Sequence, residues 1–394
     1  FGLVLLGGLA AGELSRRVLS LPRTTGYVVF GLLIGQSGLN WITPLHIDSA
    51  QLFIDLALGL ILFELGYLVP RTGTRDGLNR LLAGIGIALA SGLLMFAVFT
   101  FWDFNTRAAV FASALCLATS PAITIATCSD VGAKGERTGL LYTMVAINGG
   151  VAFTAVALMA PFLTETATLD DATLLADALG SIGASLLLGG VCAGLVLLAA
   201  GRLGRQVEHQ HLLILGCIVL GVGTAIHLEV SVFLPMLIFG ILVQTCDREQ
   251  KVVAIRIAGD ARVFMVVTFV LAGAALDVVY LQQFWPEALL IALIRLTGQF
   301  LAARLAGRRL GLSQRESLLL SIGLQPMSSV ALVLLVNTQT LYSGMPPMLV
   351  GILMATILLM QLFGPLATQT AIKGFGEATR LMPKRLDTPA TPST

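Results

Sequence analysis

Long apolar stretches separated by short polar breaks run along the whole chain. Most of the stretches are about 20 residues long, which is the length that an α-helix needs to cross a bilayer. Dividing the chain at its polar breaks therefore predicts an all-α polytopic membrane protein with about thirteen transmembrane helices. The predicted helices lie near residues 2–20, 24–41, 50–70, 81–102, 108–129, 138–163, 176–201, 207–226, 229–246, 261–281, 285–307, 315–337 and 344–372.

The composition agrees with a membrane protein, because 56% of the 394 residues are hydrophobic and only 12% are charged. A soluble domain carries roughly a quarter charged residues. The basic residues form no run interleaved with aromatics, so we expect no nucleic-acid partner. The five cysteines lie in or beside apolar stretches and lack the spacing of metal ligands, so we expect neither a metal site nor another cofactor.

The positions of Lys and Arg predict the orientation of the chain. Of the 24 basic residues, 22 fall on alternate loops or in the C-terminal tail. We expect the protein in the inner (plasma) membrane of the cell. Because cytoplasmic loops carry the excess of positive charge, the N-terminus is predicted outside and the C-terminus in the cytoplasm. The Trp and Tyr residues all fall at predicted helix ends, as expected of interfacial aromatics. We interpret the apolar segment that begins at Phe1 as a membrane span.

Three short motifs recur at an offset of about 207 residues, which indicates an internal repeat. FGLLIG at 30–35 resembles FGILVQ at 239–244, LFELG at 62–66 corresponds to VLAG at 270–273, and SPAI at 120–123 corresponds to QPMS at 325–328. Seven helices separate the corresponding members, and an odd number reverses the direction through the membrane. The chain is therefore predicted as a 6+1+6 inverted repeat, with a first repeat over 1–163, a linking helix over 176–201, a second repeat over 207–372 and a short tail over 373–394.

The third motif places a proline in the middle of two corresponding helices. Pro121 follows Thr119 and Ser120, and Pro326 follows Gln325. Proline removes a backbone donor and clashes with the preceding turn of a helix. Helices that are broken at matching positions of two inverted repeats mark the binding site of a transporter, so we predict two crossed discontinuous helices. The alternative for each proline is an ordinary kink that neighbouring hydroxyl groups satisfy.

These motifs also carry a family resemblance that spans residues 1 to about 372. The order and spacing of LPRTTGYVVFGLLIGQSGL, ILFELGYLV, ATSPA, FVLAGAALD and GLQPMSSVALVLL resemble those of the monovalent cation:proton antiporters of the bacterial potassium-efflux and sodium/proton exchanger type. The resemblance implies a homodimer with a sodium/proton antiporter-like fold. It also implies a core domain that carries the ion site across the membrane.

The resemblance draws attention to Asn148 and Gly149, which lie in the middle of the sixth predicted helix. Members of the family carry an Asp-Asp or Asn-Asp pair there, and the second aspartate exchanges the cation for a proton. That aspartate is missing, because Asn does not titrate and Gly has no side chain. Many relatives also place a lysine on the eleventh helix where this chain has Gln299, with Arg295 one turn earlier. Losing the lysine together with the aspartate avoids a lone buried charge.

Glu64 lies within the third predicted helix and is the remaining candidate for a titrating group. A carboxylate at membrane depth is a functional candidate, although a structural ion pair with Arg295 is an equal alternative. The candidate ion- or substrate-binding residues are Thr119, Ser120, Asn148, Gly149, Gln325, Glu64, Arg295 and Gln299.

The sequence thus favours a secondary transporter of monovalent cations and protons with atypical or weakened proton coupling. Two alternatives stay open. One is a carrier of an anionic or neutral solute, since half-helix N-termini and Arg295 favour such a ligand. The other is a non-transporting sensor or assembly subunit on the same fold. We expect no enzymatic activity, because no nucleophile–base or paired-carboxylate arrangement occurs at core depth.

Overall fold

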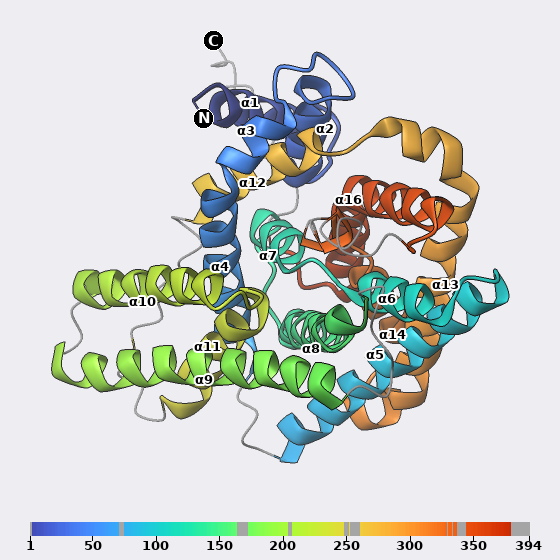
Figure 1. Cartoon of the computed structure of the whole chain (residues 1–394). Helices are drawn as coiled ribbons and strands as arrows, with labels where there is room; N and C mark the ends of the chain where they lie inside the picture. The colour runs from blue at the N-terminus through green and yellow to red at the C-terminus, as the bar shows by residue number, and fades with distance from the viewer. Residues whose placement is uncertain are drawn as a thin grey trace, which may run out of the picture.

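The structure, a computed structural model, describes residues 2–70, 75–163, 172–203, 207–247, 252, 261–328, 330–332, 334–336 and 344–379. The described residues are almost entirely helical (Figure 1). The first part of the chain contains α1 (Gly2–Val18), α2 (Arg23–Ile34), α3 (Pro44–Ser49), α4 (Gln51–Leu68), α5 (Arg75–Phe101), α6 (Thr106–Leu117), α7 (Pro121–Asp130), α8 (Glu136–Met159) and η1 (Ala160–Leu163). The second part contains α9 (Ala172–Leu203), α10 (Val207–His227), α11 (Phe233–Cys246), α12 (Ala261–Ala274), α13 (Val278–Leu310), α14 (Gln314–Gly323) and α16 (Pro347–Phe375).

Each of the predicted spans has a helical counterpart among the described residues, which confirms the all-α prediction. Outside the interrupted spans, the boundaries differ by up to seven residues; α2, for example, ends at Ile34 rather than near residue 41 because the chain turns at Gly35. The predicted spans that contain Pro121 and Pro326 are each interrupted. Seven helices of the described residues are long and apolar enough to cross a membrane, namely those at Gln51–Leu68, Gly77–Phe101, Glu136–Leu163, Ala172–Ala200, Glu208–His227, Val278–Gly307 and Pro347–Phe375.

The helix packing follows the predicted inverted repeat. In that repeat α2 corresponds to α11, and α4 corresponds to α12. The structure packs α2 against α12 and α4 against α11, so the two pairs are equivalent. In the same way, α5 packs on α6 as α13 packs on α14, and α6 packs on α8 as α14 packs on α16. Figure 1 shows α1, α2 and α12 gathered at one side of the molecule, while α9 and α10 lie side by side at another.

The recurring glycines of the motifs explain why these pairs pack so closely. A Cβ atom added at Gly31 of α2 would overlap the carbonyl oxygen of Val270, and one at Gly273 of α12 would overlap that of Val28. The equivalent pair behaves alike, because a Cβ atom at Gly66 or Gly240 would overlap a backbone carbonyl of the facing helix. Small residues at such positions let helix backbones touch in a membrane, where packing replaces the hydrophobic effect.

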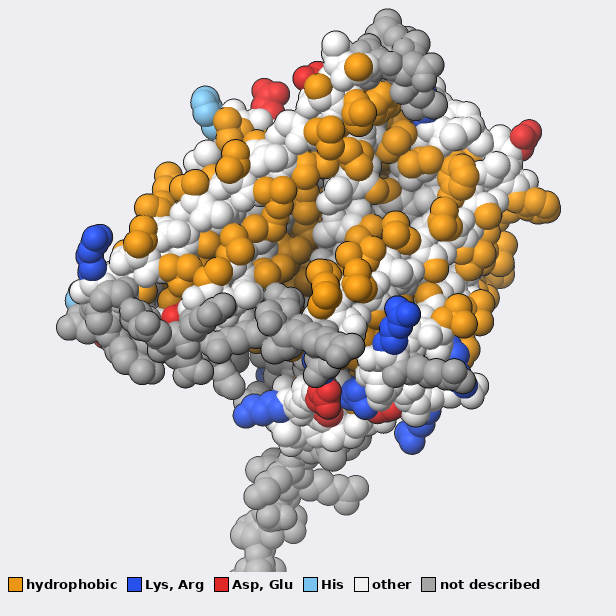
Figure 2. Space-filling model, turned by 90° about the horizontal axis from the view of Figure 1, so that it is seen from below, with side chains coloured by type: hydrophobic (Ala, Val, Ile, Leu, Met, Phe, Trp, Pro, Cys, Tyr) orange, Lys and Arg blue, Asp and Glu red, His pale blue; other side chains and the backbone are white. Residues whose placement is uncertain are grey.

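The outer surface carries the apolar belt of a membrane protein. Large apolar side chains such as Leu6, Phe101, Leu187 and Leu305 are between 71% and 87% exposed. Figure 2 shows apolar side chains over most of one face, with Lys and Arg gathered toward one end of the molecule. In water such a surface is an unfavourable patch, whereas hydrocarbon solvates it.

Candidate functional site

Two extended segments cross at the centre of the molecule, between the broken helices. The first segment joins α6 to α7, and the second follows α14. The Ser120 amide donates to the carbonyl of Pro326 at 2.9 Å, and the Ser328 amide donates to the carbonyl of Ala118 at 3.2 Å. Thr119 and Met327 thus form an isolated antiparallel bridge. The prediction of two crossed discontinuous helices is confirmed, and the alternative of simple proline kinks is wrong.

Local sequence explains how α7 starts at the crossing. Ser120 is the N-cap residue, and its Oγ accepts a hydrogen bond from the Ile123 amide at 3.3 Å. Pro121 occupies the first helical position, where a missing N–H leaves no bond unmade. On the opposite side, Pro326 lies in the extended segment and packs against Gly364 of α16. Any side chain at position 364 would collide with Pro326, whose Cα is 2.7 Å from the position of a Cβ atom.

A chain of polar contacts surrounds the crossing. Asn148 of α8 donates from Nδ2 to Thr119 Oγ1 at 3.4 Å, and Thr119 Oγ1 donates to the carbonyl of Leu324 at 3.3 Å. Arg295 of α13 donates from Nη2 to the same carbonyl at 3.5 Å and from Nη1 to the carbonyl of Gln325 at 2.8 Å. The structure therefore brings Thr119, Asn148, Gln325 and Arg295 together, as the sequence predicts.

Gln299 joins this group through Gln325, whose Nε2 donates to Gln299 Oε1 at 2.9 Å and to the carbonyl of Ser321 at 3.0 Å. Both amides are at least nine-tenths buried. Several polar atoms of the group have no hydrogen-bond partner, namely Asn148 Oδ1, Arg295 Nε and Gln299 Nε2. Because an unpaired buried polar atom is costly, such atoms mark a place where an ion, a water molecule or a ligand contributes bonds.

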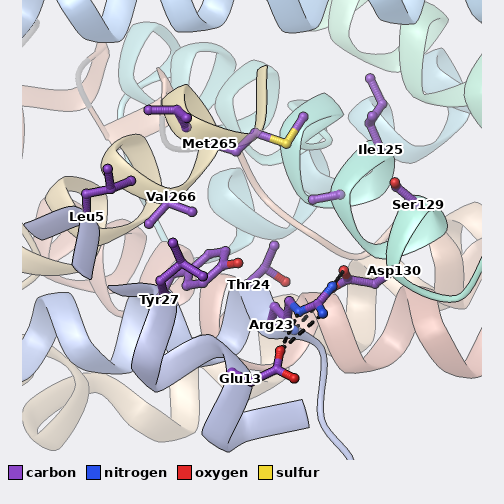
Figure 3. Close-up of a pocket in the computed structure, with 13 residues that line it drawn as sticks. Leu5, Glu13, Arg23, Thr24, Tyr27, Ile125, Ser129, Asp130, Met265 and Val266 are labelled. Carbon is purple, nitrogen blue, oxygen red and sulfur yellow. Dashed lines mark hydrogen bonds and ion pairs between the residues drawn. The ribbon is translucent and has the colours of Figure 1, made fainter. Parts of the chain in front are cut away.

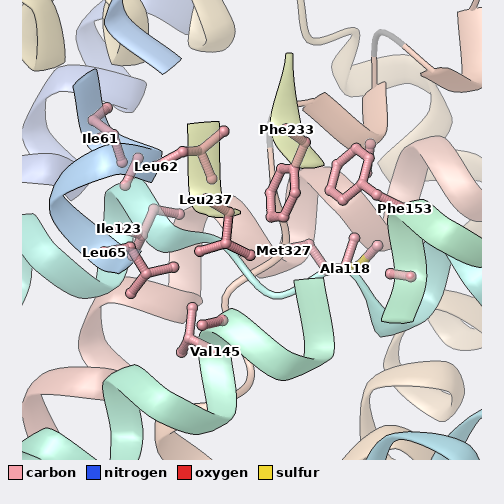
Figure 4. Close-up of a cluster of buried hydrophobic side chains, with 14 of the residues drawn as sticks. Ile61, Leu62, Leu65, Ala118, Ile123, Val145, Phe153, Phe233, Leu237 and Met327 are labelled. Carbon is pink, nitrogen blue, oxygen red and sulfur yellow. The ribbon is translucent and has the colours of Figure 1, made fainter. Parts of the chain in front are cut away.

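An aromatic ring fills the space beside Gly149. A Cβ atom at position 149 would lie 2.5 Å from Cζ of Phe233, which comes from α11. Phe233 is fully buried and stacks on Phe153 with ring centroids 3.9 Å apart and an interplanar angle of 15°. Figure 4 shows both rings beside Ala118 and Met327 of the crossing. Sequence reasoning missed this ring, because nothing near Phe233 in the chain indicates its partner.

Glu64 lies apart from the hydrogen bonds that Arg295 forms. It is half-buried on α4 and lies within electrostatic range of Tyr142 of α8. The partners of Arg295 are the backbone carbonyls of Leu324 and Gln325, and none of the ion pairs between described residues joins Arg295 to Glu64. The hydrogen bonds of Arg295 go to backbone carbonyls, and a structural ion pair between Glu64 and Arg295 stays a prediction.

A second polar cluster lies at one end of the molecule, beside a cavity of about 360 Å³ between α1, α2, α7 and α12 (Figure 3). Arg23 donates to Asp130 Oδ1 at 2.9 Å and to Glu13 Oε2 at 3.1 Å. Glu13 also pairs with Arg16 and Arg17. Arg23 thus connects α1 and α2 to the half-helix α7, a link that the sequence did not reveal.

A larger cavity, of about 420 Å³, lies near the first residues of α4 and α11. Its lining includes Gln51 and Asp55 of α4, Leu234 of α11 and Phe153 of α8. Phe153 belongs to the stacked pair that covers Gly149. Phe153 therefore borders this cavity and contacts the ring that fills the space beside Gly149.

Comparisons with known proteins agree with this geometry. A profile of the family described as sodium/hydrogen exchanger, transmembrane, matches residues 2–373. Among solved structures, the chain is similar to the sodium proton antiporter MjNhaP1 from Methanocaldococcus jannaschii at pH 8, with a TM-score of 0.68 and 18% sequence identity over 95% of this chain and 98% of that chain. No curated protein matches the chain by sequence. At this low identity, the structural likeness shows a shared fold.

Proposed function

The chain belongs to the sodium/hydrogen exchanger family, and we propose that it is a secondary transporter of monovalent cations and protons with weakened proton coupling. The observation that carries this proposal is the Phe233 ring, which fills the space beside Gly149. The family pattern places an aspartate at this position. A group that exchanges a cation for a proton must ionise near the working pH, and neither Asn148 nor Gly149 does so.

In this proposal, neutral oxygens at the crossing hold the cation. Asn148 Oδ1 is buried without a partner, and the Thr119 and Ser120 oxygens lie on the adjoining extended segment. Glu64 carries the proton, because it is a carboxylate at membrane depth on the neighbouring helix α4. The separate locations of the two functions explain why their coupling is weak.

We further propose that the protein works as a homodimer in the inner (plasma) membrane. The alternating distribution of basic loops supports an outer N-terminus and a cytoplasmic C-terminus. Residues 380–394 of the predicted tail lie outside the described part of the chain.

The experiment is a measurement of proton flux in proteoliposomes that carry an imposed pH gradient. We expect sodium, lithium or potassium to dissipate the gradient slowly, and we expect Glu64→Gln to abolish the cation-dependent part of the flux because Gln does not titrate. The matched control is Glu136→Gln, since Glu136 forms an exposed ion pair with Arg80 at 2.8 Å, outside the crossing. Rapid exchange that survives Glu64→Gln would show that another group carries the proton.

A second candidate function is a non-transporting sensor or assembly subunit. The Phe233 ring, which stacks on Phe153, favours it, because Phe233 fills the space beside Gly149 where the family pattern places an aspartate. A complete lack of cation-dependent and proton flux, in the wild-type protein and in Phe233→Ala alike, would support this candidate over a weak antiporter. A carrier of an anionic or neutral solute is the third candidate, and the lone charge of Arg295 favours it.

A further inference from the structure

Arg295 is a cation buried at the crossing whose partners are all neutral. It is 2% exposed, and its two hydrogen bonds go to the carbonyls of Gln325 at 2.8 Å and Leu324 at 3.5 Å. The second bond is long, and Nε has no partner. None of the ion pairs formed by the described residues includes Arg295. A buried charge without a counter-charge strongly destabilises a folded protein.

Other groups offset only part of this charge. The carbonyls of Leu324 and Gln325 follow the C-terminal end of α14, which carries a partial negative charge of about half an electron. The side chain with an electrostatic effect on Arg295 is Cys116 of α6, and a neutral thiol is not a counter-ion. A net positive charge therefore remains at this depth.

Two more hydrogen-bond donors without partners lie on α13 and on the adjoining α5, within about one helical turn of Arg295 along α13. Gln299 Nε2 belongs to the residue one turn further along the same face of α13. Ser91 Oγ belongs to α5, which packs against α13 at Gly298, where a Cβ atom would lie 3.7 Å from Ser91 Oγ. Gln299 and Ser91 are 1% and 2% exposed. The guanidinium, the amide and the hydroxyl thus form a buried group of donors with a positive charge.

We propose that a small inorganic anion, such as chloride, binds beside Arg295 within reach of Gln299 and Ser91. Anions accept hydrogen bonds and are attracted by the guanidinium, whereas a metal cation is repelled by it. A monoatomic anion suits the enclosed position, because its spherical charge accepts bonds from several directions. The bound anion supplies the negative charge that the neutral partners of Arg295 lack. This inference concerns stability and does not rest on cation transport.

The test compares the thermal stability of the purified protein in sodium chloride and in sodium gluconate, at equal sodium concentration and ionic strength. Gluconate is a bulky organic anion and serves as the reference for the small chloride ion. We expect chloride to raise Tm by at least about 2 °C when it is in large excess over its Kd, because a ligand that binds only the folded state stabilises it. Equal Tm values in the two salts would overturn the proposal.

Variants assign the effect to the site. Arg295→Met should abolish the chloride-dependent rise in Tm, and Gln299→Met and Ser91→Ala should each reduce it by more than half, since they remove donors and conserve most of the volume. Arg80→Gln removes a distant ion pair and should keep the full rise. If Arg295→Met does not fold, the Gln299 and Ser91 variants decide the question. A chloride-dependent rise in Tm that is the same in all variants would indicate a general salt effect and overturn the proposal. Crystals grown in bromide that show no anomalous peak beside Arg295 would also overturn it.

Discussion

At the scale of single residues, Gly149 and Gly150 are neighbours in the chain with different surroundings. A Cβ atom at position 149 would lie 2.5 Å from the Phe233 ring, and Phe233 is held in place by its stack on Phe153. A Cβ atom at position 150 would meet its nearest neighbour, Leu237 Cδ2, at 4.0 Å, which is an ordinary contact. The absence of a side chain is therefore a packing requirement at 149 and not at 150.

This difference predicts opposite effects of the same substitution. Gly149→Ala should lower the free energy of unfolding by about 1–3 kcal/mol, because overpacking displaces a buried ring. Gly150→Ala should be neutral or should stabilise the protein by up to about 1 kcal/mol, because alanine favours a helix over glycine. Thermal denaturation of both purified variants measures the difference. Equal effects of the two substitutions would argue against a fixed position for Phe233.

At the scale of helices, the two equivalent pairs α2–α12 and α4–α11 hold the repeats together through backbone contacts. Gly240 of α11 approaches the Phe63 carbonyl of α4 so closely that a Cβ atom would overlap it. A backbone atom cannot swing aside as a side chain can, so the whole helix must move to accept a methyl group. The four glycines at these two contacts therefore set the distance between the helices.

We expect Gly240→Ala to destabilise the protein by at least about 1–3 kcal/mol, because two packed helices must separate. Gly190→Ala on α9 is the matched control, since no atom lies within 4 Å of a Cβ atom at that position. The measurement is the Tm of each variant in detergent. A loss of Tm for Gly190→Ala as large as that for Gly240→Ala would mean that helix propensity or lipid contact, rather than the α4–α11 approach, sets the effect.

At the scale of the whole molecule, two cavities lie among helices that correspond in the inverted repeat. The smaller lies among α1, α2, α7 and α12, and the larger includes residues of α10, α11, α4 and the helical residues 330 and 334. These two sets of elements are equivalent in the repeat. The Arg23–Asp130 ion pair spans one side of the smaller cavity, and the Phe153–Phe233 stack borders the larger.

Cys246 provides a test of the predicted orientation. It is exposed at the end of α11, whereas Cys116, Cys128, Cys192 and Cys217 are buried. Because this end of α11 is predicted in the cytoplasm, a membrane-impermeant maleimide should label inside-out vesicles and leave right-side-out vesicles essentially unlabelled. Cys246→Ser is the control and should remove the labelling. Labelling from the outer side would reverse the predicted topology.

The sequence by itself determined the membrane spans, the inverted repeat, the broken helices and the family. Bilayer hydrocarbon forces each spanning segment to satisfy its own backbone hydrogen bonds, so the apolar pattern specifies helices locally. Pro121 and Pro326 mark the breaks because their chemistry acts on the adjacent turn. The glycines of the repeated motifs can be recognised in the sequence. The close backbone approaches at Gly31 and Gly240 are the physical reason that they recur.

Only the tertiary structure decided which groups complete the site. The Phe233 ring reaches Gly149 from another helix, Arg295 binds the carbonyl of Gln325, and Arg23 binds Asp130, which is 107 residues away. The periodicity of apolar residues in the sequence does not predict such contacts. They depend on how each helix is rotated about its axis and how far it is shifted along its neighbour. Those variables are set by the packing of all the helices together.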